Sequence, residues 1–339
     1  MNIEKYLDVI NSCRFCFMCR HLDPVGNVTF KEADTPRGRA LILDQVRMDR
    51  EKLKNHDFID TMYKSTLSAA NCYHCVSHFD EAALVLAARK DIVEADLAPE
   101  KIKKLAEELK KADFKVAGEG TVLYYMDTYT EQHQPEVAIA FLKLAGKCKT
   151  IRGGDCGKAL NMLGFSKEAS AIADKFAKAV KAAGCSTLVT NCPASYDALK
   201  KDFPIDGVKV MHSSEYLLSL KIKKSGSINA YYLESDYLKN YNANLQAPRE
   251  LLESMGYKLT MFGTNKEESY TAGEGAVIYD KIFPEVMEKL SARIWEMADN
   301  PEKDLIITAS PYTKFALKKF NSKFNVVTIE EAVLNAKGN

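Results

Sequence analysis

The chain has 339 residues, of which 46% are hydrophobic and 27% charged, so it is long enough for two or three domains with cores of their own. A formal net charge of +1 argues against nucleic acid or an anionic membrane surface as a partner, because both attract strongly basic proteins. The first residues carry charges where a signal peptide needs an apolar core, and the longest apolar run, 82–88, is too short to cross a membrane. We therefore expect a cytoplasmic protein.

The first loop of the chain contains three closely spaced cysteines. Cys13, Cys16 and Cys19 have the C-x2-C-x2-C spacing of a bacterial ferredoxin loop. In such a loop a fourth cysteine follows three residues later, and here Asp23 occupies that position. One wrapped segment with this spacing presents three soft thiolates to a single point. We therefore expect it to bind a [4Fe–4S] cluster.

A second cysteine loop follows a helix predicted at 35–48, whose Thr-Pro pair is typical of a helix start. The loop supplies Cys72 and Cys75, with His78 where a third cysteine would stand. In a two-cluster ferredoxin the fourth ligand of each loop binds the other loop's cluster, so Asp23 and His78 would complete a second cluster. A shortened loop would instead let Cys75 serve the first cluster. The ligand count thus predicts one cluster and allows a second.

A zinc site is the main alternative for these loops. The pairs Cys13/Cys16 and Cys72/Cys75 together form the four-cysteine set of a structural zinc site. Cys19 would have no role in such a site, which favours iron. Disulfides are not expected, because the cytosol keeps thiols reduced.

The pattern of the chain changes after the second cysteine loop. Residues 80–97 have a strong apolar face and are predicted to be a helix, and 99–114 are so highly charged that we expect a solvated connecting helix. From Gly120 on, short apolar strands alternate with helices, which indicates parallel α/β sheets. We predict strands at 121–127, 149–154, 186–191, 208–213, 228–235, 257–263, 276–280, 304–310 and 325–332.

These strands are predicted to form an internal repeat. The stretch that begins at Thr187 aligns without gaps with the stretch that begins at Leu305, so that Cys192 corresponds to Ser310. "YYMD" at Tyr124 likewise corresponds to "YYLE" further along the chain. The common order of the matches indicates duplication of a half of about 110 residues.

The order of these features resembles one known family. "CRFCFMC", "TPRGRALILDQV", a second cysteine loop, two α/β halves and "APRELLE" are similar to the iron–sulfur subunits of glycolate oxidase, anaerobic glycerol-3-phosphate dehydrogenase and heterodisulfide reductase. The resemblance covers almost the whole chain. It implies an α/β protein with a helical ferredoxin-like domain at 1–97, a helical connector at 98–118, and two Rossmann-like CCG-type halves with parallel sheets at 119–224 and 225–339.

In that family each half has a CCG motif and a later C-P-x-C, which bind a metal or a non-cubane iron–sulfur cluster. Here the first half retains Cys156, in "DCG", and Cys192, in "CPAS", whereas the second half has no cysteine. Cys156 and Cys192 are expected to converge at the carboxyl ends of their strands. With Asp155 and Asp127 they would hold a metal or a cluster, or the two thiols would act as a redox dithiol. The alternative is that both are free thiols left from a lost site.

The resemblance implies an electron-transfer subunit that passes electrons to or from a flavoprotein dehydrogenase or another redox subunit. The alternative is a catalytic subunit similar to heterodisulfide reductase, which acts on a thiol, a disulfide or a small substrate at Cys156 and Cys192. A zinc-stabilised interaction module is a third hypothesis. We expect no nucleic-acid partner, and contact with a membrane only through a partner protein.

Overall fold

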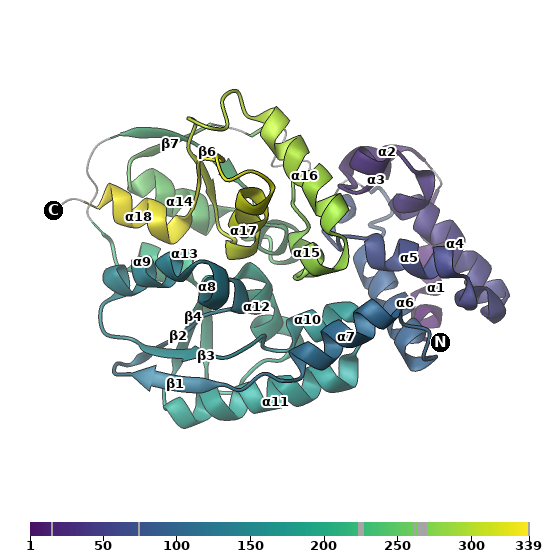
Figure 1. Cartoon of the computed structure of the whole chain (residues 1–339), viewed down its shortest axis with the longest axis horizontal. Helices are drawn as coiled ribbons and strands as arrows, with labels where there is room; N and C mark the ends of the chain where they lie inside the picture. Colours follow the sequence, from purple (N-terminus) through teal and green to yellow (C-terminus); the bar gives the residue numbers. More distant parts are fainter. Residues whose placement is uncertain (15, 74, 223–226, 261, 264–269, 338–339) are drawn as a thin grey trace.

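The protein has an N-terminal helical part followed by two β-sheets (Figure 1). The structure is a computed structural model that describes residues 1–14, 16–73, 75–222, 227–260, 262–263 and 270–337. Within these ranges the regular elements before residue 110 are all helices, and the strands follow them. The predicted α/β class is therefore confirmed.

The N-terminal part consists of α-helices joined by short 3-10 helices. They are η1 Asn2–Tyr6, α1 Leu7–Ser12, α2 Met18–Leu22, α3 Gly26–Thr29, η2 Glu32–Asp34, α4 Pro36–Met48, η3 Arg50–Lys54, α5 His56–Lys64, η4 Ala70–Tyr73, α6 Glu81–Glu94 and α7 Glu100–Leu109. The Thr35 Oγ1 accepts a hydrogen bond from the Gly38 N–H at 3.2 Å, which caps α4 as its sequence predicts. The helices predicted next, α6 and α7, are confirmed as well.

The first sheet has five strands in the order β1-β3-β2-β4-β5, and only the pair β1 and β3 is antiparallel. The strands are β1 Lys115–Gly118, β2 Val122–Tyr125, β3 Lys149–Arg152, β4 Thr187–Thr190 and β5 Lys209–His212. The connecting helices are α8 Thr128–His133, α9 Pro135–Ala145, α10 Lys158–Leu163, α11 Ser166–Ala183, α12 Pro193–Asp197, η5 Ala198–Asp202 and α13 Ser213–Ser219. β1 lies inside the predicted helical connector, so that prediction is wrong beyond Leu109. All four residues of β1 are exposed, so the strand has no apolar pattern by which its sequence could reveal it.

The second sheet has four parallel strands in the order β7-β6-β8-β9. They are β6 Ile228–Leu233, β7 Tyr257–Thr260, β8 Ile306–Thr308 and β9 Val326–Thr328. The helices are η6 Tyr237–Tyr241, α14 Gln246–Ser254, η7 Glu274–Ala276, α15 Tyr279–Ile282, α16 Pro284–Met297, α17 Pro311–Phe320 and α18 Ile329–Ala336.

The strand predicted at 276–280 is wrong, because this segment forms η7 and the start of α15. Its apolar residues are buried against the N-terminal part rather than in a sheet. A Cβ atom on Gly275 would lie 2.4 Å from the main-chain oxygen of Leu67, and the Tyr279 hydroxyl donates a hydrogen bond to the Lys64 carbonyl at 2.6 Å. A short buried apolar run has the same sequence signal in a strand and in a helix.

The two sheets share the order of their parallel strands, since β3-β2-β4-β5 corresponds to β7-β6-β8-β9. Cys192 and Ser310 both precede the proline that starts a helix, α12 in one half and α17 in the other. Gly157 and Gly273 both have positive φ angles, of 106° and 100°, and both start a helix after the second parallel strand. Duplication of one ancestral half would produce these equivalences.

Buried contacts join the two sheets and the N-terminal part. The ring of Tyr124 in β2 stacks on Phe141 in α9, with centroids 4.2 Å apart, and Tyr232 of the second sheet belongs to the same apolar cluster. Arg89 in α6 is fully buried and donates a hydrogen bond to the Met162 carbonyl of α10 at 2.8 Å. The N-terminal helices are thus fixed to the first α/β half.

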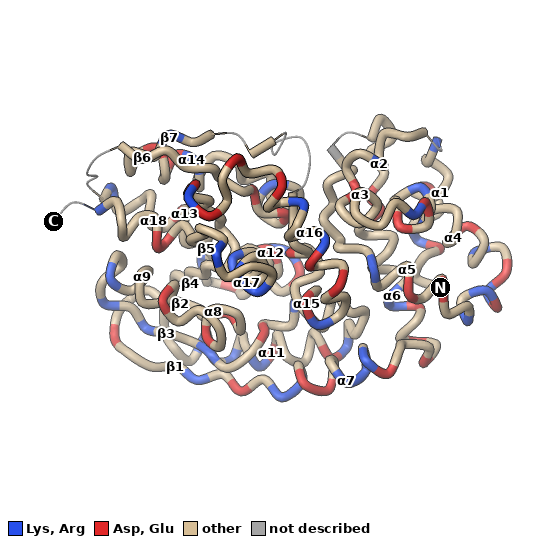
Figure 2. The backbone as a smooth tube through the Cα atoms, turned by 45° about the horizontal axis from the view of Figure 1, so that its top comes forward, with Lys and Arg blue, Asp and Glu red and all other residues tan. Residues whose placement is uncertain are grey.

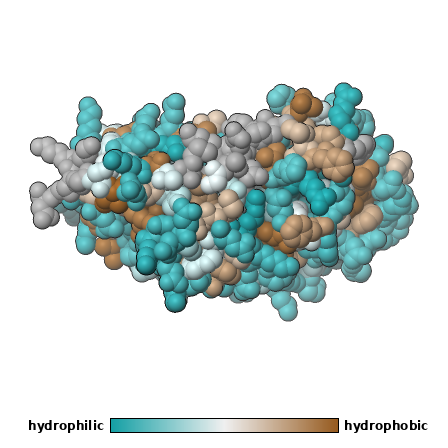
Figure 3. Space-filling model, turned by 90° about the horizontal axis from the view of Figure 1, so that it is seen from above, coloured by the Kyte–Doolittle hydropathy of each residue, from teal (hydrophilic) through white to brown (hydrophobic). Residues whose placement is uncertain are grey.

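The surface is mixed in charge and polarity. Basic and acidic residues are interspersed along the backbone that the structure describes (Figure 2), and apolar residues are scattered among hydrophilic ones on the face seen in Figure 3. In the part of the chain that the structure describes, no helix combines the length and the apolar character needed to cross a membrane.

Candidate functional site

Four of the five N-terminal cysteines line one pocket in the helical part. Cys13 directly follows α1, Cys16 lies two residues before α2, Cys19 lies in the first turn of α2, and Cys75 comes from the second cysteine loop. The other residues that line this cysteine pocket are Arg14, Met18, Arg37, Val76, Ser77 and Phe79. The two loops that were predicted to supply ligands therefore meet at one place.

Local hydrogen bonds shape the second loop so that Cys75 faces this pocket. Asn71 is buried, its main-chain carbonyl accepts a bond from the Cys75 N–H at 3.0 Å, and its side-chain amide donates to the Phe79 carbonyl at 3.0 Å. The His78 N–H donates to the Cys75 carbonyl at 2.8 Å, and His78 has a φ of +48°. The loop is thus a tight turn that closes between Asn71 and Phe79.

Arg37 connects the walls of the cysteine pocket. Its guanidinium lies 4.2 Å from the centre of the Phe17 ring, and Nη1 donates a hydrogen bond to the Cys16 carbonyl at 3.4 Å. Glu32 forms an ion pair with the same guanidinium. Burial raises the pKa of the Cys19 thiol to about 11, and the main-chain N–H of Arg37 opposes this shift by hydrogen bonding to the sulfur. An N–H group aimed at sulfur stabilises a thiolate ligand.

A zinc ion and a [4Fe–4S] cluster place different demands on the cysteines of this pocket. Within the described ranges, no three His, Cys, Asp or Glu side chains lie close enough together to hold one metal ion. A zinc site needs four sulfurs at about 2.3 Å from one ion. In a [4Fe–4S] cluster each thiolate binds a different iron, so the four ligands stand farther apart around a shared pocket. The four cysteines of the pocket also differ from the predicted zinc set, because Cys72 does not line it.

The residues predicted for a second cluster are not brought together. The Asp23 Oδ1 accepts a hydrogen bond from the Gly26 N–H at 2.7 Å, and Oδ2 is bound by the guanidinium of Arg39. The Cys72 thiol lies 3.6 Å from the Phe79 carbonyl oxygen, and His78 is exposed outside the cysteine pocket. Both oxygens of Asp23 therefore serve the fold in this structure.

Arg39 links the two cysteine loops. It is fully buried, and its guanidinium forms ion pairs with Asp23, four residues after Cys19, and with Glu81, six residues after Cys75. It also donates a hydrogen bond to the main-chain carbonyl of the residue before Thr35 at 2.6 Å. One buried cation thus fixes the ends of both loops.

The second predicted site lies at the carboxyl ends of the parallel strands of the first sheet, as expected for an open α/β sheet. Asp127 follows β2, Cys156 follows β3, and Cys192 follows β4. The Ser195 hydroxyl is within hydrogen-bonding reach of both sulfurs. The structure therefore brings Cys156 and Cys192 together with Asp127 and Asp155, as the sequence predicts.

These thiols are poorly suited to be nucleophiles. Burial raises the pKa of both Cys156 and Cys192 well above the usual value, and the neighbouring carboxylates raise it further. Burial also raises the pKa of Asp155 to about 6, and that of Asp127. A helix N-terminus at Cys192 and the Lys158 cation near Cys156 favour the thiolates, as they do at reactive cysteines, but burial outweighs both effects on the pKa.

Glu274 of the second half lines a pocket together with Asp127, Asp155 and Cys192 of the first half. The sequence analysis did not identify Glu274. Burial, with the nearby carboxylate of Asp236, raises the pKa of Glu274 to about 8. Glu274 directly follows a glycine that corresponds to Gly157, and this equivalence in the repeat is the signal that could have located it. The two halves thus face each other across an acidic pocket.

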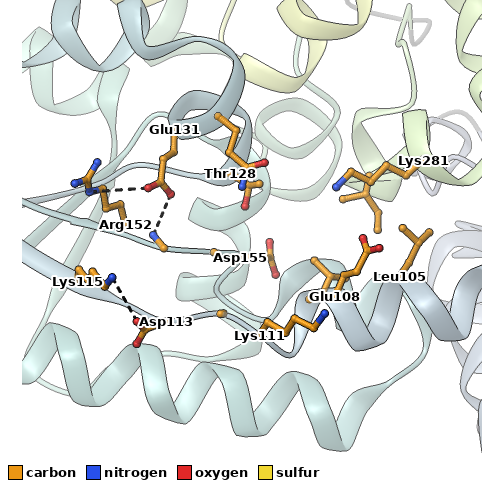
Figure 4. Close-up of a pocket in the computed structure, with 16 residues that line it drawn as sticks. Leu105, Glu108, Lys111, Asp113, Lys115, Thr128, Glu131, Arg152, Asp155 and Lys281 are labelled. Atoms are coloured by element: carbon orange, nitrogen blue, oxygen red, sulfur yellow. Dashed lines mark hydrogen bonds and ion pairs between the residues drawn. The ribbon is translucent and has the colours of Figure 1, made fainter.

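A larger cavity of about 660 Å³ opens beside this acidic pocket (Figure 4). α7, the loop after β3 and α15 form its walls, and Asp155 and Lys281 line both spaces. Gly153 has a φ of +114°, and a Cβ atom there would lie 2.0 Å from the Asp113 carbonyl oxygen. The main chain that precedes β1 therefore packs directly on the loop after β3. This loop contains Gly153 and Gly154, is named here the glycine loop, and forms the floor of the cavity.

Neither a scan against models of protein families nor a search of curated proteins finds a match for the chain.

Proposed function

We propose that this protein is an iron–sulfur electron-transfer protein in which Cys13, Cys16, Cys19 and Cys75 hold one [4Fe–4S] cluster. The observation that carries the proposal is the pocket that these four cysteines line together. A cubane cluster takes four cysteine thiolates, and three of these four have the ferredoxin spacing.

When bound, such a cluster accepts and releases single electrons without making or breaking bonds to a substrate. The residues of the chain provide the surroundings that this chemistry needs. The Arg37 main-chain N–H donates to the Cys19 sulfur, and its guanidinium adds a positive charge beside the thiolates. The apolar side chains of Phe79 and Met18 line the cysteine pocket.

The partner that fits this proposal is a flavoprotein dehydrogenase or another redox subunit in the cytoplasm. Its support is the resemblance in motif order to the iron–sulfur subunits of the glycolate oxidase, glycerol-3-phosphate dehydrogenase and heterodisulfide reductase group. In that reading the two α/β halves, with one degenerate CCG site and one that has lost its cysteines, serve mainly as a scaffold.

The catalytic alternative has less support. The cavity beside Asp155 could admit a small molecule, but the raised pKa values of Cys156 and Cys192 keep both thiols protonated near neutral pH. Thiol–disulfide chemistry and a metal at this site are therefore not part of the proposed function.

Metal analysis, together with substitution of two cysteines in the second cysteine loop, tests the proposed cluster. Anaerobically prepared protein is expected to be brown, to contain about four iron atoms and four sulfides per chain, and to give an electron paramagnetic resonance signal on reduction. Cys75→Ser should lose most of its iron, whereas Cys72→Ser should keep the wild-type content, because only Cys75 lines the pocket. Colourless protein, bound zinc, or equal losses in the two variants would contradict the proposal.

A further inference from the structure

Large apolar side chains are exposed at the mouth of the cysteine pocket. Phe17 is 64% exposed, Met18 51% and Val76 80%. Met18 and Val76 line the pocket, and Phe17 lies under the guanidinium of Arg37, which also lines it. Figure 3 shows apolar residues exposed over this N-terminal end of the molecule, at the right. Single exposed apolar residues are common, but a group contributed by two separate loops marks an interaction surface.

The charges around this mouth are positive. Arg14 and Arg37 are the charged residues among those that line the pocket, and in the described part of the chain no acidic residue lines it. Arg20 in α2 is 43% exposed, and its guanidinium lies 4.0 Å from the Glu32 carboxylate. Two nearby carboxylates are already engaged, since Glu32 pairs with both Arg37 and Arg20, and Asp23 is buried against an arginine. Three arginines with one exposed carboxylate leave this end of the molecule with a positive balance.

Resting on the proposed cluster, we infer that this surface, formed by Arg14, Phe17, Met18, Arg20 and Val76 and here named the docking face, binds a small redox protein with an acidic rim around its own cofactor. The apolar centre excludes water from the contact, and the arginines steer an acidic partner to it. Transient redox complexes bury little surface, so such a contact does not require a large face. Docking there would let one electron pass from the reduced partner to a cluster held by Cys13, Cys16, Cys19 and Cys75, and no bond would form or break.

The test measures binding as well as electron transfer. The dissociation constant between the anaerobically prepared full chain and an acidic plant-type [2Fe–2S] ferredoxin is determined by calorimetry, with basic cytochrome c as the charge control. We expect binding of the ferredoxin but not of cytochrome c. The affinity should fall steeply between about 50 and about 500 mM NaCl, because salt screens exposed charges.

Two variants and two matched controls locate the contact. Arg20→Glu and Val76→Asp should each weaken binding about tenfold or more at low salt and slow reduction of the cluster by the ferredoxin. Lys104→Glu on α7 and Ile139→Asp on α9, which change an exposed residue of the same type far along the chain, should leave both values unchanged. Iron content is measured in every variant.

Each outcome decides between defined possibilities. If all four variants keep their iron and bind the ferredoxin like the wild type, the docking face is wrong while the cluster stands. A wild-type protein without iron and sulfide overturns the proposed function, and the docking inference with it. Sedimentation that shows a wild-type dimer converted to a monomer by Val76→Asp would assign the face to a second copy of this chain instead.

Discussion

Asp23 stands where the ferredoxin pattern has its fourth cysteine, and its contacts give it a different role. Its carboxylate is 6% exposed and pairs with Arg39, which is 0% exposed, so each group would be a buried uncompensated charge without the other. Because the same guanidinium also binds Glu81, the pair holds the first cysteine loop against the second. In the proposed cluster the fourth ligand is therefore Cys75 of the second loop rather than a residue of the first loop.

Asp23→Asn tests this role. The substitution keeps the shape and the acceptor for the Gly26 N–H but removes the charge that Arg39 needs, so the free energy of unfolding should fall by about 1–3 kcal/mol. Asp44→Asn is the matched control, because Asp44 pairs with Arg47 at 2.8 Å with both side chains about one-third exposed, and its loss should cost less than about 1 kcal/mol. Urea denaturation measures both. If Asp23 were an iron ligand, Asp23→Asn would lose iron without a comparable loss of stability.

At the scale of single elements, the sequence predicts what depends on local pattern and misses what depends on distant partners. The spacing of Cys13, Cys16 and Cys19 and the eight apolar segments that became β2 to β9 could be identified because each carries its own periodic signal. β1 has no buried face, so its sequence carries no such periodic signal. Arg39 and Glu81 are 42 residues apart, and no local pattern reveals that they form an ion pair.

The glycine loop after β3 gives a prediction at this scale. Gly153→Ala should be strongly destabilising, by about 3 kcal/mol or more, because its Cβ would overlap the Asp113 carbonyl oxygen in addition to the strain of a positive φ. Gly207→Ala is the control, since Gly207 also has a positive φ, of 78°, but no heavy atom lies within 4 Å of the added Cβ. Its cost should be about 1 kcal/mol.

Chemical denaturation compares the two alanine variants, and hydrogen exchange reports whether β1 has separated from β3. Equal losses of stability would mean that backbone strain alone matters and that the segment before β1 can move away from the loop. Exchange that increases only in Gly153→Ala would show that the floor of the cavity holds β1 in place.

At the scale of the whole molecule, the two α/β halves are joined through a buried interface that contains an acid. Glu330, in α18 of the second half, is 0% exposed and accepts a hydrogen bond from the Ser213 hydroxyl of the first half. Its other oxygen has no hydrogen-bond partner among the described residues. Burial raises the pKa of Glu330 to about 7, so the folded protein keeps this group protonated in a pH range where the unfolded chain has lost the proton.

The stability of the interface should therefore depend on pH in a definite direction. A carboxyl with a raised pKa binds more protons in the folded state, so its contribution to stability is fully present below pH 4.5, its value in the unfolded chain, and is lost as the pH rises to about 7. The loss is on the order of 3 kcal/mol, since each pKa unit corresponds to about 1.4 kcal/mol.

Glu330→Gln cannot ionise and should match the wild type at low pH but be more stable above neutral pH. Glu285→Gln, an exposed change on α16, should follow the wild-type curve throughout. Denaturation curves at several pH values measure the difference, and a wild type that loses no stability relative to Glu330→Gln between pH 4.5 and about 7 would show that Glu330 is ionised in the folded protein.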